Sequence, residues 1–194
     1  LFVSGRLNSA MYGDSVKPPQ PAGLWKSVSM ASPFTYVADK GDKIVRRSFY
    51  TYWRRAMPPP QMTIMNAPSR EFCLTRRERT NTPQQALLLM NEQEFFKAAQ
   101  TTAAIALDEA GGDEDKGLRR VYERITSHVP AAERLALLRE TLGEFRDHYK
   151  SEPELTEAMT PDQGEADVER RVELAAWTMV THCLFNLELA KVKR

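Results

Sequence analysis

The chain has 194 residues and a net charge of only +1, with 27 Lys and Arg against 26 Asp and Glu. This length fits one domain, or one domain with an ordered arm. The sequence contains two cysteines and three histidines, and it has no C-x-x-C pair and no run of about 18 apolar residues. These counts exclude a disulfide scaffold, a four-thiolate zinc site, haem attached to this chain and a membrane-spanning helix.

The near-neutral total hides two halves of opposite charge. Residues 1–90 carry 13 Lys and Arg against 5 Asp and Glu, a net charge of +8, whereas residues 91–194 have a net charge of −7. Nine of the twelve prolines precede residue 84. Proline lacks an N–H donor and fixes φ, so long helices are not expected in that half. We predict a mainly α protein with a C-terminal helical bundle, an irregular Pro-rich N-terminal arm and a short β element.

The first half divides into an arm and an arginine-rich region. Residues 1–43 combine turn formers with scattered aromatic residues, which indicates an extended arm that lies over other structure. Residues 44–54 are rich in β-branched and aromatic side chains and precede three prolines, which favours a strand. Residues 62–68 are its candidate partner strand. We therefore assign residues 44–82 to an arginine-rich strand and loop region.

The second half has the pattern of a helical bundle, over residues 83–194. Thr82, Pro83 and Gln85 form the signature of a capping box at the start of a short helix. Apolar periodicity and glycine or proline stops predict further helices at about 92–110, 115–127, 131–150 and 166–188, with a polar loop at 151–165. The last helix is apolar over so wide a face that we expect it at the centre of the bundle, in one domain with the arm.

An arginine cluster is the main candidate for a binding site. Eight arginines and no lysine lie between residues 46 and 79. The guanidinium group offers a planar fork of donors that pairs with carboxylate, phosphate or sulfate. Three interpretations stay open: pairing with the acidic half, a surface for an anionic glycan or another subunit, and nucleic acid, which is disfavoured because no nucleic-acid motif accompanies the cluster. The candidate residues are Arg46, Arg47, Arg54, Arg55, Arg70, Arg76, Arg77, Arg79 and Asn81.

Other reactive side chains give no catalytic constellation. The histidines lack metal-ligand spacing, and there is no G-x-S-x-G elbow, so we assign no catalytic or metal-binding residue. His182 is expected to be a satisfied histidine between helices, and Glu173 a partner for an arginine. Cys73 and Cys183 could form a disulfide in an oxidising compartment if their geometry allows it. Whether the chain is an enzyme stays open.

The blocks RRSFYTYWRR, PPP, NAPSRE and RRERTNTPQQALLLMN occur together here. In this combination the chain closely resembles the C-terminal domain of large planctomycete-type exported proteins, which also carry a cytochrome-c-like domain and a second domain of unknown function. The resemblance implies a domain without an established activity, a periplasmic or cell-surface location, and haem on an upstream domain or partner, not on this chain. The start on Leu1 fits a piece of a longer protein. Asn66 stands where the family pattern usually has Asp, which favours a structural role for this position.

We therefore expect a non-catalytic C-terminal module of an exported cytochrome-c-type protein that packs against sister domains or subunits. The alternative is a glycan-binding or glycan-processing domain that uses the arginine cluster for sulfate or uronate.

Overall fold

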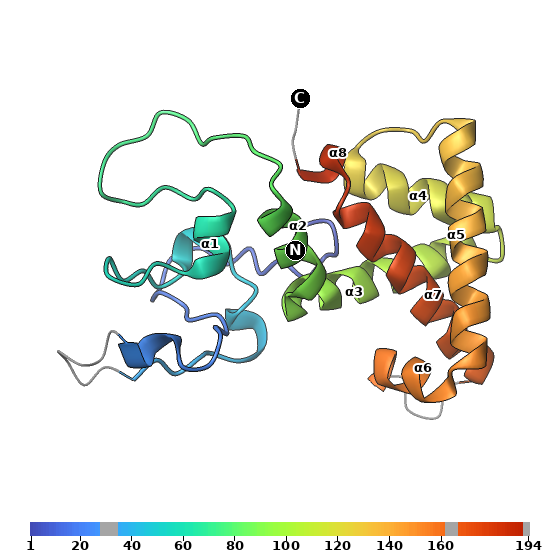
Figure 1. Ribbon diagram of the computed structural model, residues 1–194, viewed down its shortest axis with the longest axis horizontal. Coiled ribbons are helices and arrows are strands. Elements are labelled where there is room, and N and C mark those ends of the chain that lie inside the picture. Colours follow the sequence, from blue (N-terminus) through green and yellow to red (C-terminus); the bar gives the residue numbers. More distant parts are fainter. Residues whose placement is uncertain (28–34, 162–166, 192–194) are drawn as a thin grey trace. The chain divides into compact units, whose positions relative to one another are not determined.

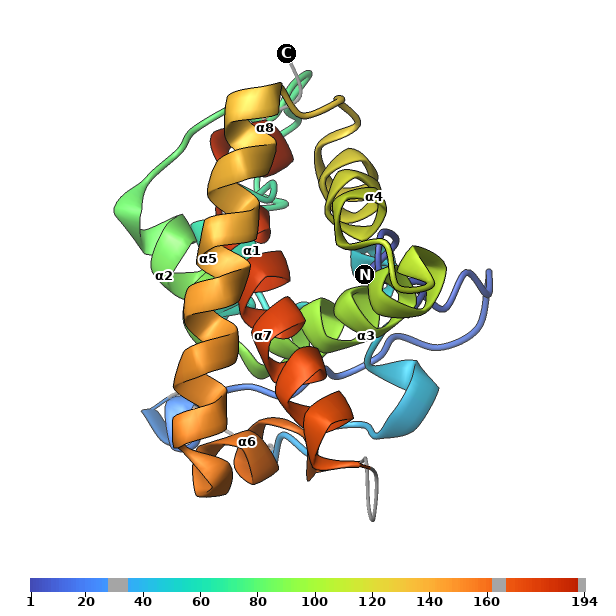
Figure 2. The same ribbon diagram turned by 90° about the vertical axis from the view of Figure 1, so that its right-hand side faces the viewer.

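The computed structural model describes residues 1–27, 35–161 and 167–191. Contacts within the chain divide it into two compact units. Unit 1 consists of residues 1–2 and 6–88, and unit 2 of residues 3–5 and 89–194. The described part of the chain is mainly helical, as predicted, and the longer helices belong to unit 2 (Figures 1 and 2).

Unit 1 is built largely from irregular chain. It contains the 3-10 turns η1 (Leu24–Ser27), η3 (Gly41–Lys43) and η4 (Ser48–Tyr50), the short helix α1 (Pro60–Ile64) and the first part of α2 (Pro83–Asn91). The arm lies along residues 45–52, as expected: the Val16 N–H donates to the Tyr50 carbonyl at 2.8 Å, and the Tyr52 N–H donates to the Val16 carbonyl at 2.7 Å. The arm also folds on itself, because Trp25 and Tyr36 stack with 4.8 Å between ring centroids.

The predicted strand at 44–54 is wrong. The described residues contain only isolated bridges, two of which join the arm to this segment, at Asn8 with Arg46 and at Val16 with Thr51. Turn η4 lies between these two bridges and interrupts any continuous ladder. The arm cannot extend the pairing past Lys17, because Pro18 and Pro19 have no N–H to donate. The short β element therefore reduces to single bridges.

The predicted partner strand at 62–68 is also wrong, because residues 60–64 form α1. Pro60 occupies one of the first positions of that helix, where its missing N–H costs no hydrogen bond.

Unit 2 is a helical bundle, as predicted. Its main helices are α3 (Gln93–Ala110), α4 (Glu114–Thr126), α5 (Ala132–Ser151) and α7 (Val168–Phe185), with the short helices α6 (Pro153–Met159) and α8 (Glu188–Lys191). Helix α7 contacts α3, α4, α5, α6 and α8, which confirms its central place (Figure 2). Helix α3 ends at Gly111, whose φ of 61° is the left-handed conformation of a C-terminal cap.

Two details of the bundle differ from the sequence-based expectation. Residues 153–159 form α6 rather than a loop, with the Thr156 hydroxyl donating to the Tyr149 carbonyl at 2.7 Å; the rest of the expected loop lies partly outside the described residues. Val168 and Cys183 belong by their spacing to the apolar face of α7, yet both are exposed. Because α7 is apolar over so wide a face, its buried direction is set by the neighbouring helices and not by its own pattern.

The ring of Trp177 fills a notch that a glycine opens inside unit 2. Trp177 is 2% exposed, and a Cβ added to Gly117 on α4 would lie 2.6 Å from Trp177 Cη2 and 2.8 Å from Ala110 Cβ. The end of α3 and helix α4 therefore meet the ring of Trp177 on α7 at this notch.

Alanine at Gly117 should therefore destabilise unit 2, although alanine is the better helix former. We expect Gly117→Ala to lower the free energy of unfolding by about 1–3 kcal/mol, the usual cost of overpacking a core. The matched control is Gly143→Ala on α5, where an added Cβ meets no atom within 4 Å. That variant should stabilise the fold by about 0.5–1 kcal/mol. Denaturant titration followed by circular dichroism measures both, and equal stabilisation by the two variants would contradict the notch.

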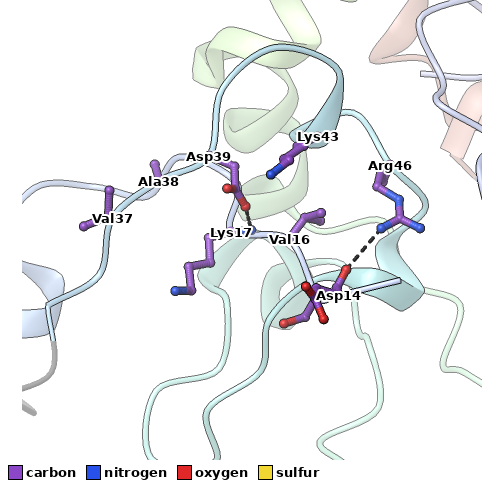
Figure 3. A pocket seen from close by; sticks show the side chains of 9 residues that line it. Asp14, Val16, Lys17, Val37, Ala38, Asp39, Lys43 and Arg46 are labelled. Carbon is purple, nitrogen blue, oxygen red and sulfur yellow. Dashed lines mark hydrogen bonds between the residues drawn. The ribbon is translucent and has the colours of Figure 1, made fainter. Parts of the chain in front are cut away.

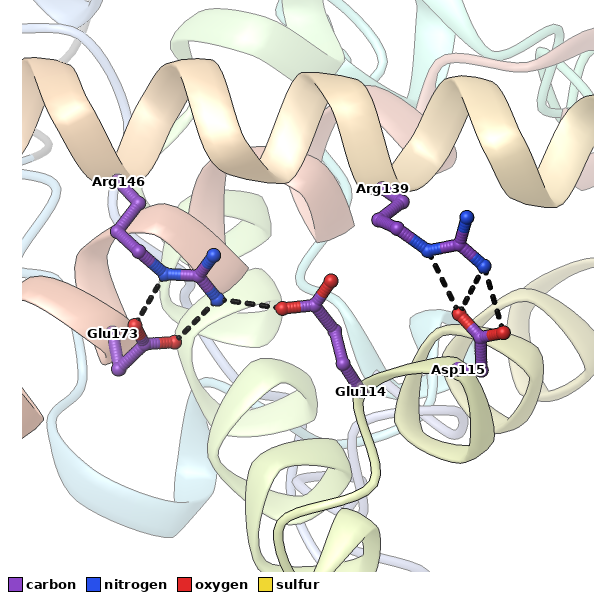
Figure 4. A network of polar contacts seen from close by, with 5 residues as sticks. All are labelled: Glu114, Asp115, Arg139, Arg146 and Glu173. Atoms are coloured by element: carbon purple, nitrogen blue, oxygen red, sulfur yellow. Dashed lines mark hydrogen bonds and ion pairs between the residues drawn. The ribbon is translucent and has the colours of Figure 1, made fainter.

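An arginine joins three helices of unit 2 (Figure 4). Arg146 on α5 donates to the carboxylate of Glu173 on α7 through Nε and Nη2, and Nη2 also donates to Glu114 on α4 at 2.8 Å. This pairing confirms the expected role of Glu173. The hydrogen bond to Glu173 is the main cause that raises the pKa of Arg146 above its ordinary value.

Removing this guanidinium would leave two carboxylates facing each other without a cation. We expect Arg146→Met to lower the free energy of unfolding by about 1–3 kcal/mol, the range for hydrogen bonds to charged groups. Arg139 offers a control: it lies at the surface of the same helix, α5, and pairs with Asp115 on α4. Because an exposed pair is solvated and screened, Arg139→Met should have a much smaller effect. Similar losses in both variants would show that the network of Arg146 is no more than a surface ion pair.

Candidate anion-binding surface

Residues 67–79 of unit 1 form a long excursion between α1 and α2 (Figure 1). Its two ends are tied at the hydroxyl of Thr80. Asn66 Nδ2 donates to Thr80 Oγ1 at 2.6 Å, and Gln85 Nε2 donates to the same oxygen at 2.8 Å. Gln85 Nε2 also donates to the carbonyl of Ile64 at 3.0 Å. The excursion is therefore closed at its base by side chains from the end of α1 and the start of α2.

The local sequence explains this tie. Asn66 adopts a left-handed φ of 54°, which Asn tolerates better than most residues. Gln85 also forms the predicted capping box, since its N–H donates to Thr82 Oγ1 and its Oε1 accepts from the Thr82 N–H. The amide of Asn66 acts as a donor here, which a carboxylate could not do. This contact agrees with the structural role that we expected for Asn66.

Every residue from 69 to 79 is exposed, and we call this stretch the arginine segment. Arg70 lies over the ring of Trp53, with 4.8 Å between the guanidinium carbon and the ring centroid. Within the described part of unit 1, Arg76, Arg77 and Arg79 form no hydrogen bond or ion pair. Four guanidinium groups and two carboxylates give the segment a net positive charge.

The remaining candidates of the arginine cluster fall into two groups. Arg47, Arg55 and Asn81 are exposed, whereas Arg46 and Arg54 are partly buried. Arg46 donates to three backbone carbonyls, those of Ala10, Tyr12 and Asp14.

Arg54 lies over the ring of Trp25 at 5.8 Å. Arg46 is therefore paired inside unit 1, with backbone carbonyls and not with carboxylates. Pairing of the exposed arginines with the acidic half stays a prediction.

Apolar side chains interrupt the charges of the arginine segment. Phe72 is 65% exposed and Leu74 is 48% exposed, with the exposed thiol of Cys73 between them. Cys73 and Cys183 are both exposed and free, and the disulfide considered from the sequence stays a prediction. A surface that mixes arginine with exposed aromatic and aliphatic groups has the composition of a protein-binding patch.

The other candidates from the sequence have structural partners. His182 Nε2 lies 2.9 Å from the carbonyl oxygen of Leu89, and its ring meets Phe96 edge to face, which confirms a satisfied histidine. Among the described residues, no group of three or more His, Cys, Asp or Glu side chains could hold a metal ion. No helix in the described ranges is long and apolar enough to cross a membrane.

Removing the acceptor at Thr80 should release the base of the arginine segment. Thr80→Val keeps the shape of the side chain but leaves the amide groups of Asn66 and Gln85 without this partner, which costs about 1–3 kcal/mol. We expect faster tryptic cleavage after Arg76 and Arg77 and faster hydrogen exchange over residues 66–82. Thr75→Val, an exposed change within the segment, is the control and should alter neither rate. Unchanged cleavage in Thr80→Val would contradict the tie.

No curated protein and no solved structure matches this chain. A family model matches residues 1–142, which is 142 of the 194 residues and includes all of unit 1. The chain therefore belongs to the family described as PSD1, protein of unknown function (DUF1553).

Proposed function

We propose that this chain is a non-catalytic docking module of a larger exported cytochrome-c-type protein. In this proposal the arginine segment binds an acidic surface on a sister domain or subunit. The observation that carries the proposal is the exposure of Arg76, Arg77 and Arg79, without internal partners in unit 1, on an excursion whose ends are tied at Thr80. Any haem belongs to the upstream domain or partner, and the location is periplasmic or at the cell surface.

The form of the segment favours binding over catalysis. Acid–base chemistry needs groups that are held in place and shielded from water, whereas residues 69–79 are exposed throughout. Arginine and aromatic residues supply much of the binding energy in protein interfaces, where they become desolvated on contact. Phe72 and Leu74 provide apolar surface next to the guanidinium groups. The tie at the base restricts the segment before binding, so less conformational entropy is lost in the complex.

The thiol of Cys73 allows a direct test in the full-length parent protein. A photo-cross-linker placed on Cys73, in a Cys183→Ser background, should form cross-links to acidic peptides of a sister domain, identified by mass spectrometry. The control places the same reagent on Cys183 in a Cys73→Ser background, where cross-links to those peptides should be absent. Efficient labelling of Cys73 without any cross-link to a sister domain or subunit would overturn the proposal.

Charge variants separate geometric recognition from simple attraction. Arg77→Gln should reduce the yield of the Cys73 cross-link about tenfold if its guanidinium makes a charge-assisted hydrogen bond with the partner. Arg77→Lys keeps the charge but loses the planar fork, so it should restore only part of that yield. Arg119→Gln, an exposed position on α4, is the control and should have no effect.

The alternative, a glycan-binding domain, predicts a different result in the same assay. A sulfated oligosaccharide would then compete with the cross-link at low concentration, and a neutral oligosaccharide of the same length would not. Direct binding of the sulfated oligosaccharide to the protein without the sister domain would favour the glycan over the protein partner.

A further inference from the structure

A second charged site lies in unit 1, apart from the arginine segment. It is a pocket of about 480 Å³, which falls within the usual size range of small-molecule sites. Five charged side chains line it, and Figure 3 shows them around the opening: Asp14, Lys17, Asp39, Lys43 and Arg46.

Hydrogen bonds fix the walls of this pocket. The Lys17 N–H donates to Asp39 Oδ2 at 2.7 Å, and the Asp39 N–H donates to the Lys17 carbonyl at 2.8 Å, which locks two walls together. Val16, which precedes Lys17 and bonds to the backbone of Tyr50 and Tyr52, is 3% exposed. Arg46 Nη1 donates to the carbonyl of Asp14 at 3.1 Å and holds the third wall (Figure 3). The pocket is therefore formed before any ligand arrives.

The charges around the pocket favour an anion that also carries hydroxyl groups. Three cationic side chains outnumber two carboxylates, so the local field attracts an oxyanion. Arg46 Nε is buried and finds no hydrogen-bond acceptor in the part of the chain that the structure describes. A carboxylate is a strong acceptor for O–H donors. Asp14 and Asp39 therefore suit hydroxyl groups, and they would repel a ligand that carried negative charge on every side.

Arg46 is held further by Tyr12, whose backbone carbonyl accepts from Arg46 Nη2 at 2.7 Å. Tyr12 itself is 81% exposed. The Tyr12 N–H donates to Tyr50 Oη at 2.8 Å, and the guanidinium of Arg46 lies 3.9 Å from the centroid of the Tyr50 ring. Tyr12 has a left-handed φ of 66°, an uncommon conformation for an aromatic residue.

We propose that this pocket binds a small hydroxylated oxyanion: a sugar acid, or a sugar ester that carries one sulfate or phosphate. Lys43 pairs with the oxyanion, and Asp14 and Asp39 accept hydrogen bonds from hydroxyl groups. The Lys17 ammonium, which lies 5.4 Å from the centroid of the Tyr52 ring, adds positive charge at the rim. Arg46 holds the wall of the pocket. This site does not depend on the docking function of the arginine segment.

Calorimetric titration of the full chain with four matched ligands tests the proposal. The ligands are glucose, glucuronate, glucose 6-sulfate and glucose 6-phosphate, at an ionic strength of about 50 mM so that screening stays weak. We expect at least one of the three anions to bind about tenfold more tightly than neutral glucose, as one charge-assisted hydrogen bond provides. The strongest of the three identifies the anionic group. Equal binding of glucose and all three anions, or binding of none of them, would overturn the proposal.

Two lysines on the same turn give a matched pair of variants. Lys43 lines the pocket, whereas Lys40, which precedes η3, does not. Lys43→Gln should weaken binding of the anion about tenfold, and Lys40→Gln should leave it unchanged. Both side chains are exposed, so neither change should unfold unit 1. Arg77→Gln should also leave this affinity unchanged, and equal losses from Lys40→Gln and Lys43→Gln would show nonspecific attraction by the basic half.

Discussion

One hydroxyl oxygen, that of Thr80, joins the parts of unit 1 on which its candidate function depends. It accepts from Asn66 at the end of α1 and from Gln85 in the first turn of α2. Gln85 is 4% exposed, so its amide would be costly to bury without these partners. The same side chain caps α2 through Thr82. The start of the helix and the base of the arginine segment therefore form together, and neither is expected to persist without the other.

The two units are stabilised in different ways. Unit 2 buries a continuous apolar core between its helices, where small residues such as Ala103, Ala175 and Ala176 let the helices approach closely. Unit 1 has few buried apolar side chains, and turns, single bridges and hydrogen bonds between distant segments hold it. Local openings of unit 1 should therefore need less free energy than those of unit 2. Ligand-binding loops are commonly drawn from such regions of low local stability.

The helices were predictable because their signals are local. The capping box at Thr82 and the glycine stop after Ala110 lie within a few residues of the ends that they define. The segment at 44–54 was not predictable in the same way. Its composition suits a strand, but the arm beside it contains Pro18 and Pro19, which have no N–H for a continuous ladder of hydrogen bonds. The notch joins Gly117 to Trp177, 60 positions further along the chain, and the tie joins Asn66 to Thr80, 14 positions further. No local sequence pattern predicts such contacts.

The charge asymmetry of the sequence has a different meaning in each unit. In unit 2, arginines of the same unit already pair with its carboxylates: Arg146 with Glu114 and Glu173, and Arg139 with Asp115. In unit 1, Arg46 donates to backbone carbonyls, and the arginine segment is exposed. Carboxylates that have an arginine nearby gain less from a second one. The acidic half therefore has less need of the arginine segment than the net charges of the two halves suggest, which supports our proposal that the segment binds an acidic surface outside this chain.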